Sequence, residues 1–222
     1  MTSGTYTYDP QVVELVESGF ERVGINADSI NSDKLRQARR SLNLMFASWA
    51  NRGVRLWAVD RQTQALTAGT ATYACATGTV SLLDMVVIVS GVETLIGPVD
   101  RFQYFAIPDK TSQGRPSLYW YERLITPQYR LWPVPDSSAT YSVAYYRLRR
   151  IQDVLTSAET FDAPYRWFDA IAAGLAARLA PMYAPDRIDT LERQANEAFG
   201  IAASEDVEHV NTRFDIDMSS YQ

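Results

Sequence analysis

Histidine and cysteine are almost missing from this sequence: its 222 residues contain one of each, His209 and Cys75. A single cysteine excludes a disulfide within the chain, and we expect synthesis in a reducing compartment such as the cytoplasm. Mechanisms of the Ser-His-Asp or Cys-His type need a histidine base, so any of them would have to use His209. The glycine-rich motifs that bind phosphates or dinucleotides are also absent.

Long apolar runs are absent as well. The longest, residues 85–89, has the length of a strand, whereas a membrane-spanning helix needs roughly 20 apolar residues. The first residues lack the basic and apolar regions of a signal peptide. We therefore expect no association with a membrane.

The few groups that could support catalysis or metal binding lack partners. Cys75 sits in a strand-like segment, where a small buried side chain is a better interpretation than a nucleophile. Glu205 and His209 are four residues apart on an expected helix, but a zinc site needs further ligands. The neighbouring carboxylates Glu205 and Asp206 fall on an expected solvated helix face. We expect no catalytic residue, no cofactor and no metal.

The charged residues are unevenly chosen. The net charge is −5, and only two of the 21 basic residues are lysines. An acidic chain is unlike a dedicated duplex-binding protein, but it is compatible with a channel through which DNA passes without binding. Arginine, together with the thirteen tyrosines and five tryptophans, is typical of interfaces. Codon bias and ordinary core aromatics explain the same composition.

Two amphipathic helices are predicted near the N-terminus. The first covers about residues 10–23, with Asp9 as its cap. The second covers about residues 33–52, with Asn31 or Ser32 as its cap. The apolar side chains of the second helix recur at spacings of three and four residues: Leu35, Ala38, Leu42, Met45 and Trp49.

Two further helices are predicted near the C-terminus. One begins at Pro164 with Asp162 as its cap, and ends at Pro181 or Pro185. The last covers about residues 186–210 and has an acidic outer face. We expect the polar tail that follows to be extended, or disordered when alone.

Between residues 58 and 154 the pattern favours strands, because Thr, Val, Tyr and Ile dominate and turn signals recur. A short helix within residues 98–108, in which Phe102, Phe105 and Ile107 are apolar, and an exposed loop at 109–116 are also predicted. The predicted strands are 64–67, 80–83, 85–89, 117–123, 129–132 and 140–147. One face of the last strand carries Tyr141, Val143, Tyr145 and Arg147.

These elements predict an α+β fold in which the N- and C-terminal helix pairs form a four-helix bundle with an inserted antiparallel β domain. The bundle would comprise residues 1–57 and 155–210, and the β domain residues 58–154. Residues 211–222 would form an extended C-terminal tail. The alternative is that a helix pair covers the sheet.

Arg147, Arg149 and Arg150 form the single basic cluster and follow two tyrosines. They could contact a nucleic-acid backbone, with the aromatic rings stacking on bases. A subunit interface or a solvated strand end is favoured because the whole chain is negative.

Several stretches together resemble the head-to-tail adaptor proteins of tailed phages, which are related in plan to the tail tubular proteins of short-tailed phages. The resemblance extends from about residue 10 to 210, and none of its stretches is a catalytic signature. The stretches that carry it are residues 42–53, 107–116, 131–135, 145–147 and 184–187.

The resemblance implies a structural protein of the virion, made in the host cytoplasm and placed at the head-tail junction. Copies of the chain would form a dodecameric ring between the portal protein and the tail nozzle or tail tube. DNA would pass through the ring without sequence-specific binding. By position alone, the C-terminal tail would bind the portal through Phe214, Ile216, Met218 and Tyr221.

Two charged sets acquire candidate roles from this resemblance. Acidic side chains on the last helix would face the channel, where cationic walls would retain phosphates; an ordinary solvated face is the alternative. Arg115, in a loop that could equally be only a turn, would join Arg147, Arg149 and Arg150 at a subunit or tail interface. The acidic set is Asp186, Asp189, Glu192 and Glu197.

Two other functions remain open from the sequence. One is a phage cell-wall hydrolase, which the single histidine disfavours. The other is a nucleic-acid-binding module that uses the arginines between 147 and 150.

Overall fold

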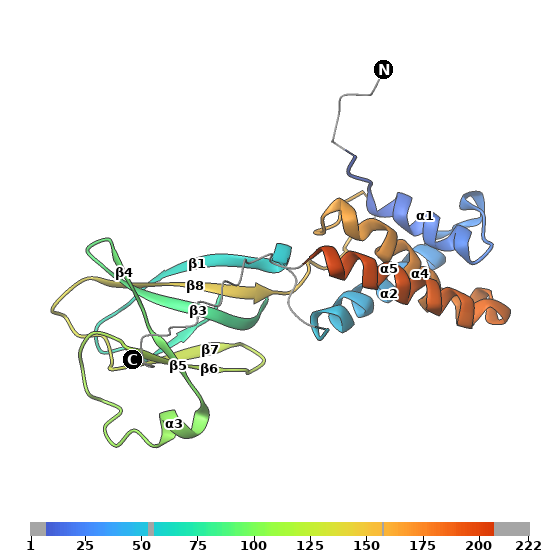
Figure 1. Ribbon diagram of the computed structural model, residues 1–222. Coiled ribbons are helices and arrows are strands. Elements are labelled where there is room, and N and C mark those ends of the chain that lie inside the picture. The colour runs from blue at the N-terminus through green and yellow to red at the C-terminus, as the bar shows by residue number, and fades with distance from the viewer. Residues whose placement is uncertain (1–7, 53–55, 157, 207–222) are drawn as a thin grey trace, which may run out of the picture.

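The chain has a mixed α+β fold with an elongated outline, which a computed structural model describes for residues 8–52, 56–156 and 158–206. These residues contain five α-helices and two four-stranded sheets. Four long helices lie at one end of the molecule and the strands lie at the other (Figure 1). The chain crosses between the two ends twice, before β1 and after β8.

The two N-terminal helices are α1, Val12–Arg22, and α2, Ser32–Ala50. The predicted cap of α2 is confirmed, because the Asn31 side chain accepts a 3.0 Å hydrogen bond from the backbone N–H of Lys34. The predicted cap of α1 is wrong. The cap position is Gln11 rather than Asp9, because Gln11 forms an isolated β-bridge with Thr160 that keeps the preceding backbone extended.

The C-terminal helices are α4, Phe168–Tyr183, and α5, Ile188–Glu205. The single turns Tyr165–Trp167 and Pro185–Arg187 precede them. Pro181 does not end α4 but lies within its last turn. The predicted cap at Asp162 is also wrong, because its carboxylate accepts hydrogen bonds from Arg149 and from the backbone N–H of Gln152.

Helix α4 lies at the centre of the helical end and packs against α1, α2 and α5. Two glycines permit the close approach of its neighbours. A Cβ atom on Gly19 of α1 would lie 2.9 Å from Leu175 Cδ2, and one on Gly174 would lie 2.5 Å from Met45 Sδ. All four long helices therefore contribute to one hydrophobic cluster, which also includes linker residues such as Phe161.

The strands form two sheets with the orders β1-β8-β3-β4 and β2-β7-β6-β5. All strand pairs in them are antiparallel except β5 with β6. Residues 92–99 pass from one sheet to the other, because β4 pairs with β3 whereas β5 pairs with β6. The strands are Val59–Ala65 (β1), Thr72–Ala74 (β2), Thr79–Val89 (β3), Val92–Leu95 (β4), Gly97–Val99 (β5), Leu118–Glu122 (β6), Gln128–Trp132 (β7) and Tyr141–Arg149 (β8).

The second hydrophobic cluster lies between these sheets and is rich in tyrosine. Tyr129, which is fully buried, stacks on Tyr73 and donates a 2.7 Å hydrogen bond to Gln64. The alternation predicted for β8 is confirmed, since Tyr141, Val143, Tyr145 and Arg147 are all buried. The strands predicted at 80–83 and 85–89 are one strand with two register shifts, and β4 and β5 were not predicted.

The short helix α3, Arg101–Phe105, follows β5 and is capped by Asp100, which accepts a 2.7 Å hydrogen bond from the N–H of Gln103. Its buried residue is Tyr104, whose ring lies 5.1 Å from that of Trp120. The predicted short helix is confirmed, and its apolar residues Phe102 and Phe105 are 80% and 78% exposed.

Replacing Leu42 with alanine tests the shared core of the helices. Leu42 is fully buried, so Leu42→Ala is expected to lower the free energy of unfolding by about 2–5 kcal/mol. The matched control is Leu44→Ala on the same helix, where the side chain is 58% exposed and the expected loss is below about 0.5 kcal/mol. Urea denaturation followed by tryptophan fluorescence measures both, and equal losses would contradict this packing.

Candidate interaction surfaces

Arg147, in β8, forms the centre of a network inside the chain rather than part of an open surface. Its side chain is 8% exposed. Its Nε and Nη2 donate to the two carboxylate oxygens of Asp60 at 2.6 and 3.1 Å. Its Nη1 lies 3.0, 2.8 and 3.0 Å from the oxygens of Ala76, Thr77 and Thr79. The paired guanidinium holds the pKa of Asp60 below its ordinary value.

Arg149 extends this network to the helical end. Its Nη2 donates to Asp162 at 2.9 Å, and its Nε lies 3.8 Å from Asp60. Asp162 raises the pKa of Arg149. The indole N–H of Trp57 also donates to the carbonyl of Asp162, at 3.0 Å. The start of β1 and the end of β8 are thereby tied to the segment that leads into α4.

Three of the four predicted interface arginines, Arg147, Arg149 and Arg150, line one hollow of about 390 Å³, and Arg115 is not among the residues that line it. Arg150 is exposed and pairs with Asp153 at 3.1 Å. Arg115 is exposed in its loop and donates to the hydroxyl of Thr94 on β4. Arg147 has internal partners but also borders this hollow. For all four arginines an interface role stays a prediction.

The four acidic residues predicted to face a channel are all exposed, and two of them border different hollows of the surface. Glu192 lines a groove of about 310 Å³ together with Arg52 and Arg178. Glu197 lines another, of about 430 Å³, with Arg22. Asp186 and Asp189 lie at the start of α5. Helix α5 therefore presents carboxylates on two sides rather than along one stripe.

The groups considered for catalysis are poorly placed for it. Burial raises the pKa of the Cys75 thiol to about 11, so a neutral thiol is expected near pH 7. Asp206 is buried and paired with Arg166 at 2.5 Å, so its expected solvated position is wrong. Among residues 8–52, 56–156 and 158–206, no group of three His, Cys, Asp or Glu side chains could hold a metal ion.

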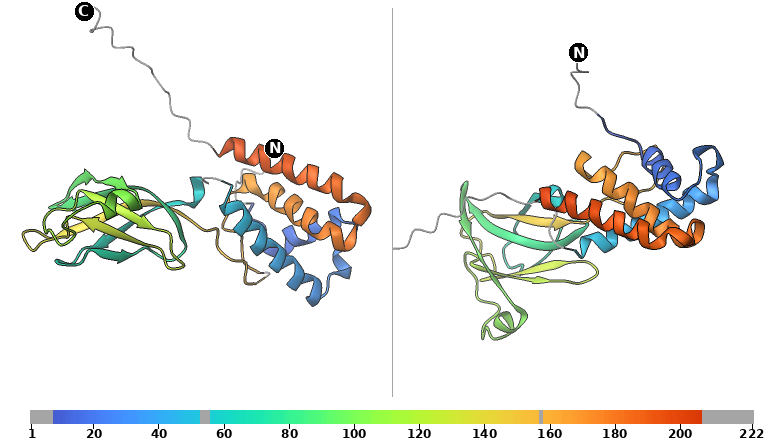
Figure 2. Two further views of the ribbon diagram at one scale, coloured as in Figure 1. Left: turned by 90° about the horizontal axis from the view of Figure 1, so that it is seen from below. Right: turned by 45° about the vertical axis from the view of Figure 1, so that its right-hand side comes forward.

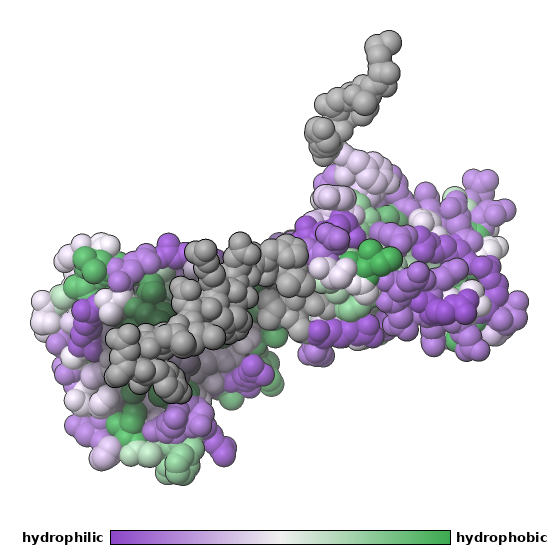
Figure 3. All heavy atoms as spheres, in the orientation of Figure 1, coloured by the Kyte–Doolittle hydropathy of each residue, from purple (hydrophilic) through white to green (hydrophobic). Residues whose placement is uncertain are grey.

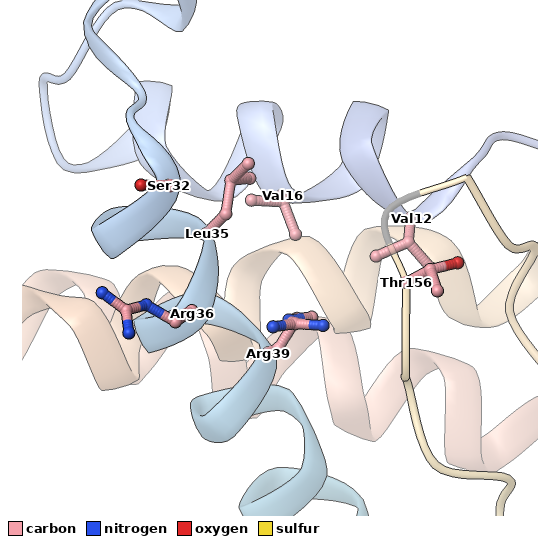
Figure 4. Close-up of a pocket in the computed structure, with 7 residues that line it drawn as sticks. All are labelled: Val12, Val16, Ser32, Leu35, Arg36, Arg39 and Thr156. Atoms are coloured by element: carbon pink, nitrogen blue, oxygen red, sulfur yellow. The ribbon is translucent and has the colours of Figure 1, made fainter.

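Two features that sequence reasoning missed are apolar. The exposed Phe102 and Phe105 line a hollow of about 340 Å³. A larger groove of about 450 Å³ lies between α1 and α2 (Figure 4). Hydrophobic residues are interspersed with polar ones over both ends of the molecule (Figure 3). The available signal was the pair of phenylalanines, Phe102 and Phe105, three residues apart on a predicted short helix.

The predicted tail residues Phe214, Ile216, Met218 and Tyr221 lie outside the described residues, and so does His209. The roles predicted for these residues therefore stay predictions. No helix in the part of the chain that the structure describes is long and apolar enough to span a membrane.

Comparison with protein families decides the broad assignment. The family model described as SU10 adaptor protein matches residues 21–215, which include helices α2 to α5 and all the strands but only the end of α1. The chain belongs to the SU10 adaptor protein family. This is a family of phage head-to-tail adaptors, as the sequence resemblance implied. Comparison with curated proteins gave no match.

Membership in the SU10 adaptor family gives the chain a structural role in the phage particle. The family implies association with portal and tail components and suggests a role other than catalysis. A virion component is consistent with it.

Removal of Arg147 is expected to destabilise this adaptor strongly. Arg147→Met leaves Asp60 and two carbonyl groups without their donor, and we expect a loss of about 3 kcal/mol in the free energy of unfolding. Arg150→Met removes an exposed ion pair from the same cluster and is expected to cost less than about 1 kcal/mol. Similar losses in chemical denaturation would show that Arg147 is not the centre of the network.

The lowered pKa of Asp60 predicts the direction in which the stability of the folded chain changes with pH. Its pKa in the folded chain lies below the ordinary 3.8, so its contribution to stability is fully present above about pH 4 and is lost as pH falls through the lowered pKa. The stability advantage of the unaltered chain over Asp60→Asn should therefore be constant from pH 7 to about 5 and shrink below about pH 4. An advantage that instead grows on acidification would contradict this sign.

Proposed function

We propose that this protein is a head-to-tail adaptor that forms a dodecameric ring between the portal and the tail nozzle, around the DNA channel. The observation that carries the proposal is the family match over residues 21–215, which spans helices α2 to α5, the strands and the junction between them. The stoichiometry and the position below the portal come from the sequence resemblance.

The arrangement of the two hydrophobic clusters supports this role. One cluster lies among the helices and the other between the sheets. We propose the division of the chain accordingly: residues 1–57 with 155–210 form a four-helix bundle domain, 58–154 form an inserted β domain, and 211–222 form the tail. An elongated chain with two separately packed ends is suited to bridging two different partners.

Charge supports passage of DNA without retention. The chain carries a net charge of −5, and carboxylates do not release condensed counterions from DNA as cationic side chains do. We propose that Asp186, Asp189, Glu192 and Glu197 lie near the lumen of the ring. They are all exposed, which such a position requires.

The two rival functions receive no specific support. A nucleic-acid-binding module built on the basic cluster would need accessible guanidinium groups, whereas those of Arg147 and Arg149 are bound to Asp60 and Asp162. A cell-wall hydrolase would need an activated nucleophile or a carboxylate pair in a cleft. The neutral thiol of Cys75 does not supply the former.

Electron microscopy of the purified chain mixed with its cognate portal protein tests the adaptor function. We expect a ring coaxial with the portal, with the start of α5 nearer the axis than α3. The chain alone, imaged at the same concentration, shows whether the ring needs the portal. A chain that never joins the portal, or joins it off the axis, would contradict the proposal.

A further inference from the structure

The groove between α1 and α2 has no role assigned to it in the proposed adaptor function. Figure 4 shows Val16 of α1 and Leu35 of α2 directed toward each other across it, with Val12 beside Thr156 at one end. Val12 and Val16 are each 1% exposed and form the floor, while Leu35 is half-buried. An apolar groove of about 450 Å³ is large enough for bulky apolar side chains.

The rim of this groove is positively charged. Arg36 and Arg39 both line it from α2. Arg36 pairs with Asp33, but both side chains are about two-thirds exposed, so this ion pair is readily exchanged. Arg39 donates to the carbonyl oxygen of Leu155. Because a carbonyl group is neutral, it does not cancel the positive charge of the Arg39 guanidinium. An apolar floor with a basic rim fits a segment in which apolar and acidic side chains alternate.

The chain itself contains such a segment. Residues 214–218 read Phe-Asp-Ile-Asp-Met, so three apolar side chains alternate with two carboxylates. In an extended segment alternate side chains point to opposite sides. The apolar set would enter the groove, and Asp215 and Asp217 would lie at its outer edge, within reach of the long arginine side chains of the rim.

The position of α5 favours a second copy of the chain as the source of this segment. The segment follows α5 in the sequence, and α5 packs against α4. The left view of Figure 2 shows α4 between α5 and α1. Helix α5 meets α2 near the C-terminal end of α2, where the rings of Trp49 and Phe199 lie 5.2 Å apart. The groove lies at the other end of α2, between Ser32 and Arg39, and so is separate from α5. A donor on one side and an acceptor on another make a heterologous contact, which generates a ring when it closes.

We infer that residues 214–218 of one copy occupy the groove between α1 and α2 of the next copy. The inference rests on the proposed ring and names one of the contacts that build it. It gives Phe214, Ile216 and Met218 a second copy as their partner in place of the portal.

Cross-linking between two full-length variants tests the contact. One variant carries Ile216→Cys and the other Leu35→Cys; the native Cys75 is buried with a raised pKa and stays unreactive. Mixed under mild oxidation, they should form a disulfide-linked dimer containing one of each. The matched control replaces Leu35→Cys with Leu44→Cys, on the same helix but exposed and outside the groove. Equal linkage to both positions would overturn the inference.

A charge exchange supplies a second measurement that does not depend on cysteine geometry. Arg36→Asp with Arg39→Asp should lower the yield of the cross-linked dimer about tenfold. Asp215→Arg with Asp217→Arg in the partner should restore it. Thermal melting of each variant checks that the substitutions, including the one at the half-buried Arg39, leave the fold intact. No loss, or a loss without restoration, would count against the groove as the acceptor.

Whether rings still form on the portal distinguishes a failure of this inference from a failure of the adaptor function. Portal-bound rings that form unchanged from the Arg36→Asp, Arg39→Asp variant would overturn the tail contact and leave the adaptor role standing. Cross-linking of Ile216→Cys to the portal instead of to a second copy would also overturn it. Correct tail cross-linking without any ring on the portal would count against the adaptor function alone.

Discussion

Burial of α4 on several sides is the constraint on which the helical end depends. α1 and α2 come from the beginning of the chain and α5 from its end, and all three pack against α4. Alanines along α4 and the glycines at 19 and 174 keep these helices close enough to exclude water. Segments more than a hundred residues apart meet here. The strands between them are therefore an insertion whose beginning and end both lie next to the helical end.

The junction between the strands and the helical end is stabilised by ion pairs as well as by apolar contacts. The buried guanidinium of Arg147 requires partners, and Asp60 with the carbonyl groups of Ala76 and Thr77 supplies them. Arg149 and Asp162 continue the network toward α4. For an adaptor that connects two components of a phage particle, a firmly bonded junction would transmit the position of one end of the molecule to the other.

The mistaken predictions share one cause, which is a distant partner. Asp162 is a good helix cap by residue type, but Arg149 occupies its carboxylate. Asp206 has the sequence context of a solvated helix end, yet Arg166 pairs with it in a buried position. Asp9 also has the residue type of a helix cap, but Gln11 takes that position at α1 and bridges to Thr160. In each case the deciding atom is far away in the sequence.

The sequence by itself determined the two helix pairs on either side of a strand-rich region, the apolar stripe of α2, the inward face of β8 and the resemblance to phage adaptors. The helices, the stripe and the inward face depend on the repeat of 3.6 or two residues along a local stretch. The resemblance depends on particular stretches of residues. Only the tertiary structure decided that Arg147 is internal, that residues 92–99 join two sheets, and that a basic-rimmed groove opens between α1 and α2. The physical reason is that burial and ion pairing depend on residues that are distant in the sequence. The periodicity of a local stretch does not identify those residues.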